Sequence, residues 1–290
     1  MNNKIIWTKH GQMLVNTKDL VVSRSLLEYG EYFESEVSLF EQLVKPSQIV
    51  VDVGANIGAH TVALARLVGP TGAVVAIEPQ RITHQILCAN VAINNLPNVT
   101  TFELGAGETQ QSLKSYEMDY EKEQNFGGYE LRSTGTTNIQ VFPLDLLLGA
   151  NPISFIKIDV EGMELEVLKG ATNVINLCRP VLYVENDREE NSEELLNLLY
   201  KLNYRVYWSL TRFFNPDNFL KNQTQIHTEA FFKLESGKLV INGFAINLLC
   251  VPKELNYQIE LPEVTNSKEH PCKTPELLAP GLPVLDFPAR

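Results

Sequence analysis

The sequence has few cysteines, no metal-binding histidine pattern and no long apolar run, and each shortage excludes a class of protein. Its five histidines show no HExxH spacing, so a zinc site of that type is not predicted. The 290 residues contain neither a signal-peptide type of apolar segment near the start nor a run of about 18 apolar residues. The four cysteines have no CxxC or zinc-ribbon spacing, which indicates thiols in a reducing compartment: Cys88, Cys178, Cys250 and Cys272. The sequence therefore predicts a cytoplasmic protein without membrane insertion.

Basic residues are also scarce relative to acidic ones. The chain has 24 Lys and Arg against 35 Asp and Glu, which gives a formal net charge of −11 at pH 7. An acidic surface repels phosphate backbones, so the charge disfavours nucleic acid as a partner. The hydrophobic content of 44% is ample for a buried core.

Patterns of buried strands and helices alternate along the chain from Ile49 onward. Apolar runs rich in β-branched residues predict five strands, in "IVVDVG", "AVVAIEP", "NVTTFELG", "ISFIKIDV" and "RPVLYVEN". Helical spacing predicts helices over residues 59–68, 80–94, 163–169 and 193–202. This alternation predicts an α/β fold with a parallel sheet covered by helices on both faces. Three later strand segments, "YRVYW", "AFFKL" and "AINLLCVP", lie too close together for helical crossovers throughout, so the sheet should end in an antiparallel pair.

The same patterns divide the chain into three parts. Residues 1–45 form a β-rich lead-in followed by a helix over 34–43, residues 46–255 form the main domain, and residues 256–290 form a proline-rich arm. The arm has no helical period and either wraps the domain or is disordered. The polar stretch 107–140 predicts a loop or hairpin over one edge of the sheet.

The stretch "VVDVGANIGAHT" predicts a strand that runs into a glycine turn and then a helix. Such a turn places backbone N–H groups and a helix start at the carboxyl edge of the sheet, where ligands bind. The dinucleotide pattern GxGxxG is missing, and no Gly-Lys-Ser/Thr follows as in a Walker motif. Asp52 would also place a carboxylate close to any phosphate. The turn therefore favours a ligand with a positive end.

S-adenosylmethionine has an ammonium and a sulfonium group and no phosphate, so it suits such a turn. Glu78, which lies 20 residues past Gly58 at the end of the second strand, can accept hydrogen bonds from both ribose hydroxyls. The candidate cofactor-binding residues are Asp52, Gly54, Ala55, Asn56, Gly58, Glu78, Pro79 and Ala106.

Several motifs together resemble the FkbM family of S-adenosylmethionine-dependent methyltransferases. They are "VVDVGANIGAHT", "VVAIEPQ" with Asn90 and Asn94, "PLDLLL", "FIKIDVEGMELEVLKGA" and "RPVLYVEND", with "GEYFESEV", "NFGG" and "NLLCVP" beside them. The resemblance implies a class I methyltransferase fold, with a seven-stranded, mostly parallel sheet and a reversed last strand. It also implies methyl transfer, most often to a hydroxyl of a sugar or secondary metabolite, so the predicted partner is a small-molecule or saccharide acceptor.

The candidate catalytic residues are Lys157, Asp159, Glu161 and Glu185. Strand alternation sends the first three to the same side if the chain stays extended that far. Neighbouring carboxylates raise one another's pKa and can leave one basic enough to accept a proton. We hypothesise that Asp159 or Glu161 orients or deprotonates the acceptor, that Lys157 tunes this pair and that Glu185 holds the acceptor. A divalent cation bridging Asp159, Glu161 and Glu185 is the less favoured alternative, so no metal ligand is predicted.

Three other functions compete with this interpretation. The first is N-methylation of an amide or amine, which the sequence leaves open for peptides; Val-Glu-Gly follows Asp159, unlike the Asp/Asn-Pro-Pro-Tyr motif of nucleobase methyltransferases. The second is a nucleotide-binding Rossmann oxidoreductase using NAD(P), which would need GxGxxG. The third is a binding module that has lost catalysis, against which the intact acidic residues argue. The acceptor and the oligomeric state are not encoded in any transferable motif.

Overall fold

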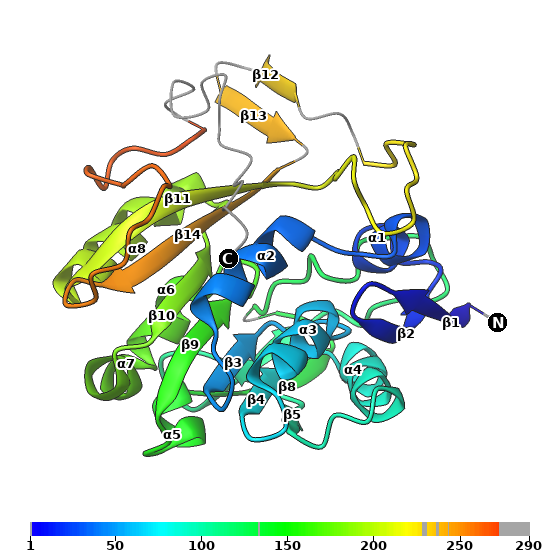
Figure 1. Ribbon diagram of the computed structural model, residues 1–290, viewed down its shortest axis with the longest axis horizontal. Helices are drawn as coiled ribbons and strands as arrows, with labels where there is room; N and C mark the ends of the chain where they lie inside the picture. Colours follow the sequence, from blue (N-terminus) through cyan, green and yellow to red (C-terminus); the bar gives the residue numbers. More distant parts are fainter. Residues whose placement is uncertain (1, 133, 228–230, 236–237, 243, 273–290) are drawn as a thin grey trace.

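The computed structural model describes residues 2–132, 134–227, 231–235, 238–242 and 244–272. A seven-stranded sheet with the order β11-β14-β10-β9-β3-β4-β5 forms its centre (Figure 1). Neighbouring strands pair in parallel from β10 to β5, and β14 is antiparallel to both β10 and β11. These strands are β3 (Ile49–Val53), β4 (Ala73–Ile77), β5 (Val99–Phe102), β9 (Ile153–Ile158), β10 (Val181–Glu185), β11 (Tyr204–Arg212) and β14 (Phe244–Pro252).

Helices cover both faces of this sheet because its strands are apolar on both sides. On one face lie α2 (Glu34–Leu43), α3 (Ala59–Val68) and α4 (Arg81–Ile93). On the other lie α5 (Leu144–Leu148), α6 (Glu164–Lys169), α7 (Thr172–Cys178) and α8 (Glu189–Lys201). Within β3, Val50 packs against α2 and α3, whereas Val51 and Val53 join the core under α5–α8. The sheet thus separates two apolar cores.

This architecture is the class I methyltransferase fold that the sequence predicts, including the reversed last strand. The predicted helix over 59–68 is confirmed as α3, and the helix over 34–43 as α2. Sequence patterns did not predict α1 (Val22–Tyr29), α5 or α7. Each has eight residues or fewer, too short for a clear helical period.

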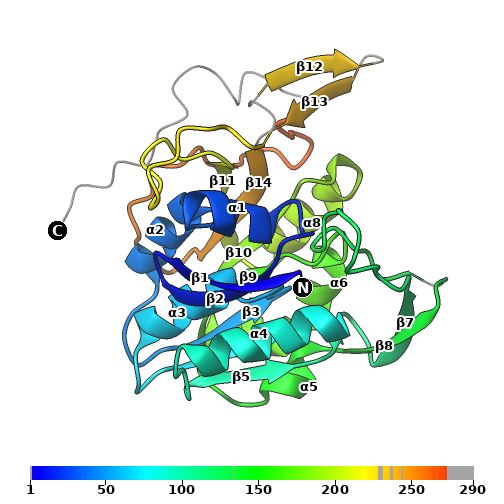
Figure 2. The same ribbon diagram turned by 90° about the vertical axis from the view of Figure 1, so that its right-hand side faces the viewer.

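The amino-terminal segment packs along the main domain through Asn90 of α4 and Asn94, the residue that follows this helix. It begins with the hairpin of β1 (Asn3–Thr8) and β2 (Gly11–Asn16), which lies beside α4 (Figure 2). Asn90 Nδ2 donates to Leu14 O at 3.1 Å and its Oδ1 accepts from Leu14 N at 2.5 Å. Asn94 makes the same pair of bonds with Gln12, at 2.6 and 3.1 Å. The two side chains bind β2 as a neighbouring strand would, and so fix the lead-in beside the ligand-binding edge.

The polar stretch 107–140 contains the predicted hairpin. β7 (Gln111–Ser115) pairs antiparallel with β8 (Thr137–Phe142), and β8 also pairs with the short β6 (Gly105–Ala106). A second hairpin joins β12 (Phe231–Glu235) to β13 (Lys238–Asn242), so the strand predicted in "AFFKL" is confirmed.

The described part of the carboxyl-terminal arm follows the sheet edge. Trp208 N donates to Pro262 O at 2.9 Å and Val264 N donates to Val206 O at 2.8 Å. Residues 256–272 therefore wrap along β11, and residues 273–290, which complete the predicted arm, lie outside the described residues. Within the described chain, none of the helices has the length and apolar character needed to cross a membrane.

We expect Asn90→Ala to destabilise the protein by about 3 kcal/mol, because it removes three hydrogen bonds from buried or partly buried groups. Denaturant unfolding measures the loss, and hydrogen exchange should show faster opening of β2 amides. The matched control is Asn138→Ala on the exposed side of β8, which should change stability by less than about 0.5 kcal/mol. Equal effects of the two substitutions would contradict this role of Asn90.

Candidate active site

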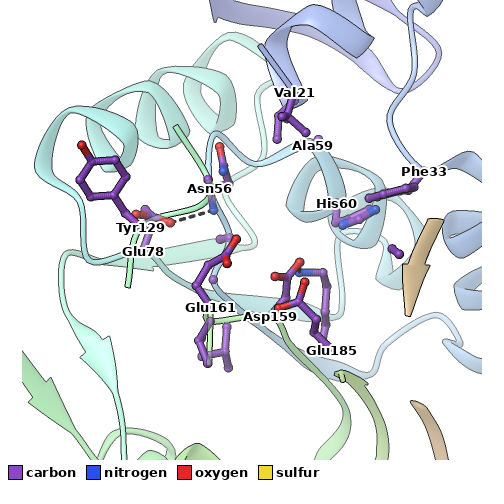
Figure 3. Close-up of a pocket in the computed structure, with 18 of the residues that line it drawn as sticks. Val21, Phe33, Asn56, Ala59, His60, Glu78, Tyr129, Asp159, Glu161 and Glu185 are labelled. Atoms are coloured by element: carbon purple, nitrogen blue, oxygen red, sulfur yellow. Dashed lines mark hydrogen bonds and ion pairs between the residues drawn. The ribbon is translucent and has the colours of Figure 1, made fainter. Parts of the chain in front are cut away.

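A cavity of about 300 Å³ opens at the carboxyl ends of the central parallel strands. The turns after β3, β4, β9 and β10 form its floor, and residues of the amino-terminal segment and of the 125–131 segment complete its walls. Ten of the twelve predicted site residues line it: Gly54, Ala55, Asn56, Glu78, Pro79, Ala106, Lys157, Asp159, Glu161 and Glu185. Figure 3 shows Glu78 and Asn56 on one side of the cavity and Glu185, His60 and Phe33 on the other.

Glu78 joins the glycine turn to the end of β4. Its two carboxylate oxygens accept from Asn56 N at 3.0 Å and from Gln80 N at 2.9 Å. Burial raises the pKa of Glu78 to about 7, although these two backbone hydrogen bonds oppose the shift. Each carboxylate oxygen has a second lone pair, so Glu78 can still accept two hydrogen bonds from a ligand.

Gly54 is required by the close approach of two strands. Its φ is +78°, and a Cβ atom there would lie 1.7 Å from Asp159 O. A larger residue would push the β3 turn away from the end of β9, so this glycine lets the two turns meet. Gly54 therefore lets Asp159, which follows β9, lie beside the glycine turn that follows β3.

Asp52 does not line the cavity, contrary to the sequence-based prediction. It is fully buried, accepts from Thr61 Oγ1 at 2.6 Å and lies 3.5 Å from Lys157 Nζ. The alternation of β3 turns its side chain toward α3 rather than along the strand to the open edge. Asp52 is therefore committed to Lys157 and Thr61 beneath the site.

Gly58 also lies outside the cavity walls. It precedes α3 with φ +89°, and a Cβ atom there would lie 2.6 Å from Leu87 Cδ1. The absence of a side chain at Gly58 lets α3 start close to α4. Gly58 therefore has a packing role in this structure, whereas the sequence predicted a contact with the cofactor.

Lys157 connects the buried interior with the cavity. Its ammonium lies 3.1 Å from Asp159 Oδ2, and its side chain is 4% exposed. Burial alone would lower the pKa of Lys157, but the charges of Asp159, Asp52 and Glu36 outweigh burial and raise the pKa. Lys157 is therefore a permanent cation at the base of the site, and Asp159 is ion-paired and partly open to the cavity.

Glu161 reaches the cavity through a turn rather than an extended strand. β9 ends at Ile158, and Glu161 has a left-handed φ of +56°. The chain is therefore not extended as far as Glu161, which strand alternation would have required, although the Glu161 side chain still lines the cavity. Burial and the nearby Asp159 raise the pKa of Glu161 to about 8, and Arg188 Nη2 lies 3.3 Å from its Oε2.

Two more acidic residues, Glu185 and Asp187, lie at and just after the end of β10. Burial, followed by the charges of Asp159, Asp187 and Glu161, raises the pKa of Glu185 well above its usual value. Its Oε2 is buried without a hydrogen-bond partner among the described residues. Burial and the neighbouring charges both favour the neutral form of Glu185, which can donate a hydrogen bond. Asp187 also lines the cavity.

Sequence reasoning missed the wall that the amino-terminal segment contributes. Glu36 of α2 lines the cavity and accepts from Asn247 Nδ2 at 2.9 Å, and His60 Nε2 lies 3.6 Å from Glu36 Oε2. The motif "GEYFESEV" contains Glu36, but its spacing does not show which side of α2 faces the ligand edge. Aromatic side chains complete this wall: Tyr32, Phe33, Phe213 and Phe244.

Of three aromatic residues in and just after β11, Tyr207, Trp208 and Phe213, one lines the cavity and two lie in the core. Phe213 lines the cavity. Tyr207 and Trp208 are buried among the sheet residues instead. Within the described residues, no three His, Cys, Asp or Glu side chains are grouped so that they could hold a metal ion.

We expect Lys157→Met to destabilise the protein by about 3–5 kcal/mol, because it leaves the buried Asp52 without its cation. Urea unfolding measures the loss, and Asp52→Asn in the same chain should restore part of it. Lys169→Met is the control, since its ammonium pairs with the exposed Glu194 and should contribute less than about 1 kcal/mol. A loss below about 1 kcal/mol for Lys157→Met would show that the buried pair is not a major support.

Two methyltransferases of fungi are similar to this chain over part of their length. The chain is 26% identical over 143 residues to Methyltransferase 1 of Beauveria bassiana, a match that covers 42% of this chain and 57% of that protein. It is 29% identical over 154 residues to Methyltransferase sdnD of Sordaria araneosa, covering 42% of this chain and 59% of that protein. The match therefore spans less than two-thirds of either relative.

Solved structures with related chain paths include an FkbM methyltransferase from Methylobacillus flagellatus. It is 20% identical with a TM-score of 0.44, over 78% of this chain and 52% of that one. An S-adenosylmethionine-dependent O-methyltransferase from Thermotoga maritima is 14% identical with a TM-score of 0.45, over 88% and 79% of the two chains.

A family model, the methyltransferase FkbM domain, matches residues 52–206. The matched region extends from the strand before the glycine turn to β11 and so includes the turns that carry Glu78, Asp159, Glu161 and Glu185. It covers more than half of the sequence, and it implies S-adenosylmethionine as the cofactor. The chain belongs to the FkbM family of methyltransferases.

Proposed function

We propose that this protein transfers a methyl group from S-adenosylmethionine to a hydroxyl group of a saccharide or secondary metabolite. The observation that carries the cofactor part is Glu78, a buried carboxylate with free lone pairs beside the glycine turn. A ribose diol offers two donors that such a carboxylate can accept.

The cavity also suits a cofactor without phosphate groups. Its acidic residues include Glu78, Asp159 and Glu185, and its one lysine, Lys157, is already paired with Asp159. A dinucleotide pyrophosphate would meet carboxylates instead of the donors and cations that it requires. This charge distribution argues against the NAD(P) oxidoreductase alternative.

The acceptor would lie near the ends of β9 and β10. S-adenosylmethionine supplies an electrophilic methyl carbon, so the protein must align the acceptor oxygen and receive its proton. As the new C–O bond forms, the C–S bond breaks with its electron pair staying on sulfur, and the hydroxyl proton passes to Asp159 or Glu161. In its neutral form, which its raised pKa favours, Glu185 would donate a hydrogen bond to a second acceptor oxygen and so orient the substrate.

The first test is binding. By isothermal titration calorimetry, the purified protein should bind S-adenosylhomocysteine and not NADH. Glu78→Gln should weaken S-adenosylhomocysteine binding about 10-fold or more, because it removes a charged acceptor of ribose hydroxyls. Glu103→Gln, an exposed residue after β5, serves as the control and should bind normally. Binding of NADH without S-adenosylhomocysteine would reject the proposed function.

The second test is turnover. Methyl-labelled S-adenosylmethionine should label a hydroxyl compound in a panel of glycosides, polyhydroxylated metabolites, amines and peptide amides. Glu161→Gln should slow this transfer about 100-fold while cofactor affinity stays within about two-fold. Unchanged turnover would remove Glu161 from the mechanism. Fragment mass spectra that place the methyl group on nitrogen would support the N-methyltransferase alternative instead.

A further inference from the structure

A carboxylate would favour binding of the cofactor's ammonium group, and Asp52 is not placed to supply one. Asp52 was the predicted partner of the ammonium group, but its side chain is fully buried outside the cavity walls. Both of its oxygens face protein groups, Thr61 Oγ1 and Lys157 Nζ. Another acidic residue of the cavity is therefore the candidate partner for the ammonium group, and this step depends on the proposed function.

Glu36 is placed to do so. It lies on α2, lines the cavity and is 3% exposed. Its carboxyl group accepts a hydrogen bond from the neutral side chain of Asn247, whose Nδ2 lies 2.9 Å from Glu36 Oε1. Within the described chain no lysine or arginine lies within ion-pair distance of Glu36. Its one basic neighbour at that range is His60, whose pKa burial lowers well below the usual value. Burial raises the pKa of Glu36 to about 8, and the positive charge of Lys157 opposes that rise. A bound ammonium group would oppose it further and favour the carboxylate form.

The other acidic groups on this side of the cavity are already engaged. Asp159 is ion-paired with Lys157 at 3.1 Å, and Glu161 with Arg188 at 3.3 Å. Asp187 has Arg188 Nε at 3.8 Å. Glu185 lies among these acids, and its burial and their negative charges raise its pKa, which disfavours its ionised form as a partner for an ammonium group.

The position of His60 supports the same assignment. The cofactor-type turn runs from Gly54 to the start of α3, and His60 lies in the first turn of that helix. His60 lines the cavity on the side opposite Glu78 (Figure 3). A nucleoside bound with its ribose at Glu78 would extend its 5′ substituent along this turn toward His60 and the adjacent Glu36.

We propose that Glu36 binds the ammonium group of the methionine tail of the cofactor. The amino-terminal segment is then a part of the cofactor site, held in place by the contacts of Asn90 and Asn94 with β2. The tail would fix α2 against the end of β14 through Asn247, which hydrogen bonds to Glu36.

Two nucleosides distinguish a contact of Glu36 with the amino-acid tail from a general effect of Glu36 on the cavity. S-adenosylhomocysteine has the amino-acid tail, whereas 5′-methylthioadenosine has the same adenosine and sulfur without it. Glu36→Gln should weaken S-adenosylhomocysteine binding at least about 10-fold, measured by isothermal titration calorimetry, and should change 5′-methylthioadenosine binding by less than about two-fold. Glu36→Asp keeps the charge and should recover part of the lost affinity. Glu41→Gln, an exposed residue of the same helix, should bind both nucleosides normally.

The outcomes distinguish the two proposals. If the unaltered protein binds neither nucleoside, the proposed function fails and this assignment fails with it. If the unaltered protein binds both, an equal loss of the two nucleosides in Glu36→Gln, or no loss of either, overturns the role of Glu36 alone. Thermal unfolding of each variant shows whether the fold is retained, and Glu36→Asp provides the comparison if Glu36→Gln is unstable.

Discussion

The buried charge of Lys157 is the constraint around which the site is built. Its ammonium lies between Asp52 of β3 and Asp159 at the end of β9, so it links the two central strands where the cavity begins. Burying this cation costs solvation free energy, which only adjacent carboxylates can offset. Other carboxyl groups of the cavity have raised pKa values, first because they are buried and then because neighbouring acidic groups repel their negative charge.

A second support comes from the segments that cover the cavity. Asp19 accepts from Ser23 N at 2.6 Å at the start of α1 and from Phe126 N at 3.3 Å in the 125–131 segment. The buried carboxylate of Asp19 thus joins two wall segments of the cavity that are more than a hundred residues apart in the chain. Arg188 ties the same segment to the floor, because it pairs with both Glu130 and Glu161. Walls and floor therefore form one polar network, and the apolar cores lie behind it.

Much of the fold could be predicted because the relevant signals are local. Apolar runs such as "IVVDVG" specify strands buried on both faces, and the glycine turn marks the ligand edge. Glu78 could be predicted for the same reason, since it ends the strand next to that turn. Asp52 could not be placed correctly, because the direction of its side chain follows from the pairing of β3 with β9 and from the position of α3.

The sequence by itself determined the order of the main-sheet strands and longer helices, the family and the cluster of acidic residues at the strand ends, since these depend on spacing along the chain. Only the tertiary structure decided which carboxyl groups face the cavity and which have a cation. Glu36 and His60 come from different helices, and Arg188 meets Glu130 across 58 positions. Such contacts depend on how the helices and loops pack in three dimensions, and no local pattern in the sequence encodes that packing.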